Sequence, residues 1–121
     1  MIRANLVRLV RLGALVCVVL IAVLSLTPRE HLVRTPLGGH VEHIVAYMGF
    51  AFLCLATVTA TRSRVVIFGL LVAYAGLLEY LQIFVPGRHS GLNDFAASAT
   101  GILFGALIAI LAGPHIADGR S

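Results

Sequence analysis

Charged residues are scarce in this 121-residue chain, and lysine is absent altogether. Only 12% of the residues are charged, whereas 60% are hydrophobic and the mean hydropathy is +1.01. Soluble domains carry about 25% charged residues. The composition therefore excludes a soluble globular domain and indicates a membrane protein.

All nine basic residues are arginines, and the formal net charge is +4. They occur at positions 3, 8, 11, 29, 34, 62, 64, 88 and 120, between or beside apolar runs. A nucleic-acid-binding protein gathers its basic side chains on one polar surface. This chain lacks such a surface, so we expect no nucleic-acid partner. The arginine spacing is typical of residues that flank membrane spans.

Several enzyme signatures are also missing. The sequence contains no G-x-S-x-G, H-E-x-x-H, G-x-G-x-x-G or Walker motif, so it offers no nucleophile, zinc site or phosphate loop of a known pattern. A metal site built from His40, Glu42, His43 and Glu79 has no such pattern behind it, and we predict no metal and no cofactor. The two cysteines lie inside apolar runs as small hydrophobic residues, and they indicate nothing about redox compartment.

Four apolar stretches predict one membrane domain over residues 1–121. The expected spans are about 10–27, 43–61, 65–85 and 94–112. The first follows a basic segment but is not followed by a small-x-small cleavage signature, so we expect a retained span. Gly113-Pro114 is expected to close the last span. The predicted fold is an all-α, integral membrane four-helix bundle.

Helical spacing predicts how two of the spans pack. The second span places its few polar and aromatic residues on one stripe, namely His43, Tyr47, Phe50, Cys54, Thr57 and Thr61. In the last span, small residues recur every fourth position, at Ala97, Gly101, Gly105 and Ala109. Gly101 and Gly105 form a G-x-x-x-G pattern, which favours close helix packing in lipid.

Arginine counts predict the orientation. With four spans, six arginines lie on the side of the two termini, and three lie on the opposite side, at positions 29, 34 and 88. Cytoplasmic loops carry the excess of basic residues. We therefore expect both termini in the cytoplasm.

Polar side chains at the outer ends of the spans form a candidate ligand-binding site. Glu79 lies about 10 Å before the end of its span at 1.5 Å per residue, and a carboxylate at depth costs about 2.5–3.5 kcal/mol. It therefore needs a partner, either Arg88 or His43. The candidate residues are His43, Glu79, Gln82, Arg88 and Asp94.

Glu79, Arg88 and Asp94 also have structural interpretations. Glu79 and its partner could be a buried ion pair that only fixes helix packing. Arg88 could clamp a phosphate or extend toward lipid headgroups. Asp94, or Asn93 beside it, could cap the last helix.

The order of these residues resembles the VanZ-like family. The similarity covers about residues 24–110, through Ser25-Leu26-Thr27-Pro28, His43-x-x-x-Tyr47, Glu79-x-x-Gln82, Pro86-Gly87-Arg88, Asp94 and Gly101. The chain departs from the family at Gly39-His40, where members have Asp-Lys, and at Ser98, where they have Asn. The resemblance implies a small multi-span protein of the bacterial inner (cytoplasmic) membrane. It also implies a link to low-level resistance to the glycopeptide teicoplanin, but no reaction.

Three functional hypotheses follow. The leading one is a non-enzymatic envelope protein that binds an anionic lipid headgroup or a lipid-linked cell-wall precursor, with Arg88 holding the anion. The alternative is a membrane enzyme acting on a lipid-linked phosphate, with His43 or Glu79 as general acid or base, which requires these groups within ~8 Å. Proton or ion conduction through Glu79, the third hypothesis, would need a continuous polar path, for which the inner halves of the spans offer only Thr57, Thr59 and Thr61. The expected partners are membrane lipids, and the sequence gives no oligomeric state.

Overall fold

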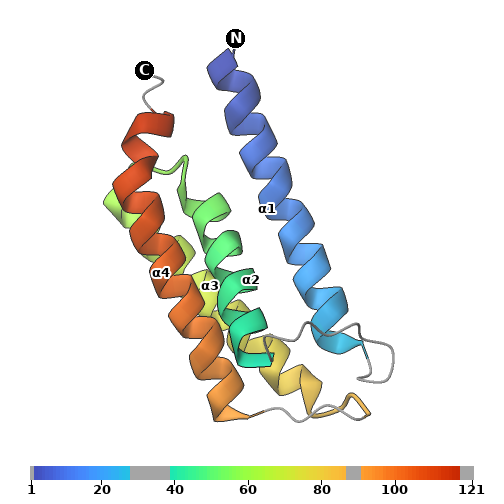
Figure 1. The fold of residues 1–121 in the computed structure, drawn as a ribbon. Coiled ribbons are helices and arrows are strands. Elements are labelled where there is room, and N and C mark those ends of the chain that lie inside the picture. Colours follow the sequence, from blue (N-terminus) through green and yellow to red (C-terminus); the bar gives the residue numbers. More distant parts are fainter. Residues whose placement is uncertain (1, 28–38, 87–90, 118–121) are drawn as a thin grey trace.

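The computed structural model describes residues 2–27, 39–86 and 91–117 of the chain. They form four α-helices, and no strand occurs among them: α1 (Ile2–Leu26), α2 (Gly39–Leu55), α3 (Thr61–Gln82) and α4 (Leu92–Ala117). The helices lie side by side in one bundle, in which α1 begins and α4 ends at the same end (Figure 1). The predicted all-α four-helix fold is confirmed.

Three helices are long and apolar enough to cross a membrane, over Ala4–Leu26, Thr61–Gln82 and Leu92–Ala112. The fourth apolar segment, Val41–Leu55, is shorter. The 17 residues of α2 correspond to about 25 Å at 1.5 Å per residue, less than the ~30 Å of the hydrocarbon core. By length and composition the chain is therefore a membrane protein whose second helix is the shortest.

The second helix ends before the residue that the sequence predicts. α2 ends at Leu55 rather than at residue 61. The Val58 N–H donates to the Leu55 carbonyl at 3.1 Å, and Arg64 Nε donates to the Val58 carbonyl at 3.1 Å. The guanidinium thus donates a hydrogen bond to a carbonyl of the connection, and this carbonyl accepts no bond within a helix. Thr57 lies in this turn and Thr61 begins α3, so both are outside the stripe predicted for the second span.

The last helix is longer than the sequence predicts. α4 continues to Ala117, through Gly113 and Pro114, where its end was expected. Proline removes one backbone donor, but its fixed φ is compatible with helix. The backbone therefore stays helical past the predicted boundary.

The most extensive helix contact in the bundle joins α2 and α4. Gly101 and Gly105 lie at this contact, against the backbone of Ile44 and Met48 respectively. A Cβ at either glycine would collide with a carbonyl oxygen of α2. The absence of a side chain at these two positions is thus what lets the backbones approach each other, as close packing in lipid requires. The buried core around this contact includes Tyr47, Phe50, Ala51, Leu78 and Ile102.

Helix α1 is the most peripheral of the four. Of its residues with described side chains, only Ile21 and Ser25 are buried, and Figure 1 shows its N-terminal half leaning away from the other helices. The Tyr74 hydroxyl donates to the Val18 carbonyl, and Gln82 Nε2 donates to the Ser25 carbonyl at 2.9 Å. Two polar contacts from α3 therefore hold the C-terminal half of α1.

Candidate functional site

Three ionisable side chains from three helices meet at one end of the bundle. His43 lies near the start of α2, Glu79 near the end of α3, and Asp94 in the first turn of α4. One nitrogen or oxygen atom from each lies within 4.8 Å of the others. This end is opposite to the one at which α1 begins and α4 ends (Figure 1). We call these three residues the triad.

The close contact of α2 and α4 positions two members of the triad. His43 directly precedes Ile44, the residue whose backbone lies against Gly101. Asp94 is seven residues before Gly101, which is about two helical turns, so it projects from the same face of α4. The glycines on this face of α4 let the two helices approach closely, and this approach sets the distance between the imidazole and the Asp94 carboxylate.

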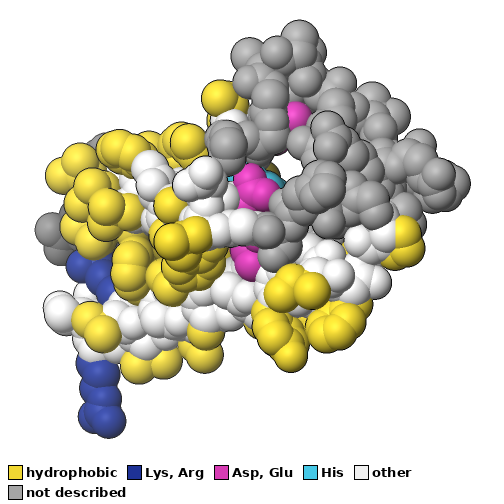
Figure 2. Space-filling model, turned by 90° about the horizontal axis from the view of Figure 1, so that it is seen from below, with side chains coloured by type: hydrophobic (Ala, Val, Ile, Leu, Met, Phe, Trp, Pro, Cys, Tyr) yellow, Lys and Arg dark blue, Asp and Glu magenta, His cyan; other side chains and the backbone are white. Residues whose placement is uncertain are grey.

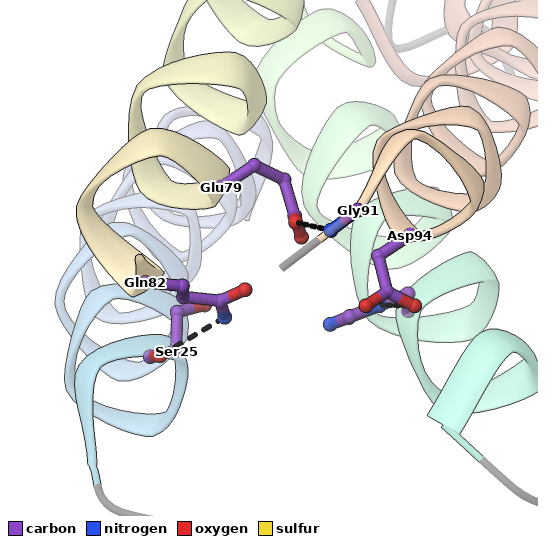
Figure 3. Close-up of polar contacts among 6 residues, drawn as sticks. Ser25, Glu79, Gln82, Gly91 and Asp94 are labelled. Atoms are coloured by element: carbon purple, nitrogen blue, oxygen red, sulfur yellow. Dashed lines mark hydrogen bonds and ion pairs between the residues drawn. The ribbon is translucent and has the colours of Figure 1, made fainter. Parts of the chain in front are cut away.

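Glu79 is the buried member of the triad, with a relative exposure of 9%. Its Oε2 accepts a hydrogen bond from the Gly91 N–H at 3.4 Å, as Figure 3 shows. The Gly91 carbonyl in turn accepts from the N–H groups of Asp94 and Phe95 at 3.1 and 3.2 Å. Gly91 is thus the residue that opens α4. The long contact orients the Glu79 carboxylate toward the start of that helix.

The expectation that Asn93 or Asp94 caps the last helix is corrected by this geometry. α4 begins at Leu92, so both residues already lie inside its first turn. Asp94 instead places a carboxylate where the positive end of the helix dipole stabilises negative charge. One of its carboxylate oxygens lies within 4.8 Å of ligand atoms of His43 and Glu79.

The imidazole of His43 faces the Asp94 carboxylate. His43 Nδ1 and Asp94 Oδ1 are 3.8 Å apart, and the side chains are 23% and 25% exposed. This separation exceeds the 2.7–3.2 Å of a hydrogen bond, so the contact between these atoms is electrostatic. Figure 2 views the molecule from this end and shows acidic and histidine side chains at the centre of the face. Two members of the triad, His43 and Asp94, are therefore partly exposed, whereas Glu79 is buried.

Gln82 makes a contact outside the triad. It is 3% exposed, and its amide donates to the Ser25 carbonyl of α1 (Figure 3). It lies about one turn beyond Glu79 on α3 and joins α3 to α1 beside the triad. Arg88, the fifth predicted residue, lies outside the described residues.

A second polar pair, which sequence reasoning did not assign to the site, lies one turn deeper in the bundle. Tyr47 is four residues after His43, and Ser98 is four residues after Asp94, and their hydroxyl groups lie near each other. They are 3% and 1% exposed. The i, i+4 spacing on both helices is the signal that could have placed them under the triad.

No protein-family model, curated protein or solved structure matches this chain. What the site can do is therefore inferred from its own chemistry. An imidazole and two carboxylates are rich in acceptors and, when both carboxylates are ionised, carry net negative charge. Taken alone, the triad suits a cation or a ligand that donates hydrogen bonds. Binding an anion there requires an additional positive charge.

Proposed function

We propose that this protein is a VanZ-like protein of the bacterial inner membrane, with both termini in the cytoplasm. In this proposal it binds the headgroup of a lipid-linked envelope precursor at the outer end of its bundle, without transforming it. The observation that supports this function is the convergence of His43, Glu79 and Asp94 at the end of an apolar bundle. Ionisable groups at the edge of membrane spans are expensive to place, and they commonly mark a ligand site.

The chemistry of the triad favours a headgroup that carries hydrogen-bond donors beside its phosphate. The two carboxylates accept hydrogen bonds from hydroxyl or amide groups, as found on a sugar or a peptide. Arg88, in the connection that leads from α3 to α4, is the arginine suited to hold the phosphate. The starts of α2 and α4 also lie at this end of the bundle, and helix N-termini favour anions.

Apolar surface beside the triad suits the lipid part of such a ligand. Ile83, Phe84 and Leu92 flank the connection between α3 and α4, and they are 62%, 70% and 82% exposed. Tyr80 packs edge-to-face on Phe84 with ring centroids 5.8 Å apart. Aromatic rings of this kind are enriched at membrane interfaces. A headgroup at the triad would therefore leave its chain against apolar side chains.

A binding measurement in nanodiscs tests the proposal. The full chain is titrated with a polyprenyl phosphate, with phosphatidylglycerol as a second phosphate source and phosphatidylcholine as the reference lipid. We expect the polyprenyl phosphate to bind best, and Arg88→Ala or Asp94→Asn to weaken it by about 10–100-fold, since hydrogen bonds to charged groups contribute about 1.5–3 kcal/mol.

The matched control is Glu42→Gln, which removes a carboxylate from the same end of α2 that is not part of the triad. It should leave the affinity unchanged. Equal binding of all three lipids, or equal loss in Glu42→Gln and Asp94→Asn, would contradict the proposed function. A teicoplanin susceptibility assay on cells that express the wild type or Glu79→Gln tests the proposed link to resistance, which predicts higher tolerance with the wild type alone.

The second candidate function is a membrane enzyme that acts on a lipid-linked phosphate. The observation in its favour is the 3.8 Å contact between His43 and Asp94, since a carboxylate that orients an imidazole is a common arrangement for general base catalysis. Incubation with a polyprenyl diphosphate tests it. Phosphate release that is lost in His43→Gln would establish the enzyme, and binding without turnover would eliminate it.

A further inference from the structure

We propose that His43, Glu79 and Asp94 form a binding site for a divalent transition-metal ion, with Zn²⁺ or Mn²⁺ as its occupant. We predicted no metal from the sequence, because these three residues are far apart in the chain and follow no ligand motif. The proposal does not depend on headgroup binding, because a metal can be measured without any lipid-linked ligand.

The donor set is suited to these ions. One imidazole nitrogen and two carboxylate oxygens come from α2, α3 and α4, and the ligand atoms lie within 4.8 Å of one another. Imidazole with carboxylates is a donor combination that both Zn²⁺ and Mn²⁺ accept, whereas Mg²⁺ and Ca²⁺ prefer oxygen alone. Three protein ligands also leave coordination positions for water or for a bound ligand.

The distances require only a small adjustment. Metal–ligand bonds of 2.0–2.2 Å in a tetrahedral site place two ligand atoms about 3.4 Å apart. His43 Nδ1 and Asp94 Oδ1 are already 3.8 Å apart, and the largest separation within the triad is at most 4.8 Å. Side-chain rotations that displace the donor atoms by roughly 1 Å therefore bring all three to one ion, with no movement of the helices.

Charge and surroundings favour a cation at this point. Glu79 is 9% exposed, and two carboxylates close together repel each other when both are ionised. A divalent ion balances both charges. The Gly91 N–H that donates to Glu79 Oε2 orients one ligand, as outer hydrogen bonds do in metal sites.

A metal at the triad would also resolve the electrostatic difficulty of the headgroup proposal. Two carboxylates repel a phosphate, whereas an ion held by them attracts it. The partial exposure of His43 and Asp94, 23% and 25%, would leave the ion reachable from the outer end of the bundle. The ion and Arg88 could then hold the phosphate together.

Metal binding to the purified, tag-free full chain in detergent tests the inference. Zn²⁺ and Mn²⁺ are titrated by calorimetry, and Co²⁺ is followed by its visible absorption. We expect one ion per chain. Asp94→Asn, Glu79→Gln and His43→Gln should each weaken it by at least about 100-fold, since even outer-shell changes cost 10–100-fold. Glu42→Gln is the control, and it should bind as tightly as the wild type.

X-ray absorption at the zinc edge of the loaded wild type identifies the ligands without any substitution, in case a variant does not fold. One imidazole and otherwise oxygen ligands are expected. Failure of the wild type to bind any of the three ions, a coordination shell with sulfur or several imidazoles, or unchanged binding in folded triad variants would each overturn the metal site. Metal binding without lipid binding would instead contradict only the headgroup proposal.

Discussion

Replacing Gly105 by alanine should destabilise the bundle through a single added methyl group. The new Cβ would collide with the Met48 carbonyl and lie 2.9 Å from the Ala51 Cβ, whereas carbon atoms in good contact are about 3.5–4.0 Å apart. Because a carbonyl and an alanine Cβ have no rotamer that could move aside, α4 must shift from α2 by about 1 Å.

The expected magnitude follows from two opposing terms. Overpacking costs about 1–3 kcal/mol, and alanine gains about 1 kcal/mol over glycine as a helix former. A collision with backbone belongs at the upper end of the first range, so we expect a net loss of about 2 kcal/mol for Gly105→Ala. Gly101→Ala should behave alike, because its Cβ would meet the Ile44 carbonyl.

Two matched variants isolate the packing term. Gly49 of α2 and Gly69 of α3 have no atom within 4 Å of an added Cβ, so their alanine variants should be neutral or more stable. Thermal unfolding in mild detergent can be followed by thiol labelling of Cys17 and Cys54, which are both half-buried. If Gly105→Ala were as stable as Gly49→Ala, the close contact of α2 and α4 would be refuted.

Three further outcomes are expected. Gln82→Leu and Tyr74→Phe each remove one hydrogen bond to the α1 backbone. The double variant should therefore show faster amide hydrogen exchange over residues 18–26 than either single variant. Equal exchange in the three variants would contradict the proposed docking of α1. Glu79→Gln keeps the shape of the side chain but removes a buried charge. The free energy of unfolding should therefore fall by no more than about 1 kcal/mol, while metal binding and headgroup binding are lost. A much larger loss of stability would indicate that the carboxylate is purely structural. With the termini in the cytoplasm, green fluorescent protein fused after the last residue should be fluorescent, and alkaline phosphatase fused at the same place should be inactive. The reverse result would place the termini outside.

The helical fold could be predicted from the sequence because apolar runs of span length leave few alternatives. The ends of the helices could not. Arg64 reaches back to the Val58 carbonyl, a contact within the connection that accompanies the early end of α2 and has no recognised sequence signal. Likewise, Gly91 rather than Asn93 or Asp94 opens α4, because a glycine carbonyl accepts the first helical bonds without any side-chain cap.

Part of the candidate site could also be predicted from the sequence. Glu79 stood out because a carboxylate in an apolar span needs compensation, and His43 and Asp94 were expected at the same end from the order of the spans. Their mutual distance depends on how closely α2 and α4 pack, which Gly101 and Gly105 control. Gln82 has the expected position, but its amide contacts Ser25 of α1, a partner that periodicity within one helix cannot identify.

A double-mutant cycle on metal affinity tests most directly whether the triad acts as one site. His43→Gln and Asp94→Asn are combined and compared with each single variant, and Glu42→Gln is combined with Asp94→Asn as the reference pair. Residues that share a ligand show interaction energies of about 0.5–3 kcal/mol. We expect a coupling of at least about 1 kcal/mol between His43 and Asp94 and none in the reference pair. Additive losses in both pairs would contradict a shared site.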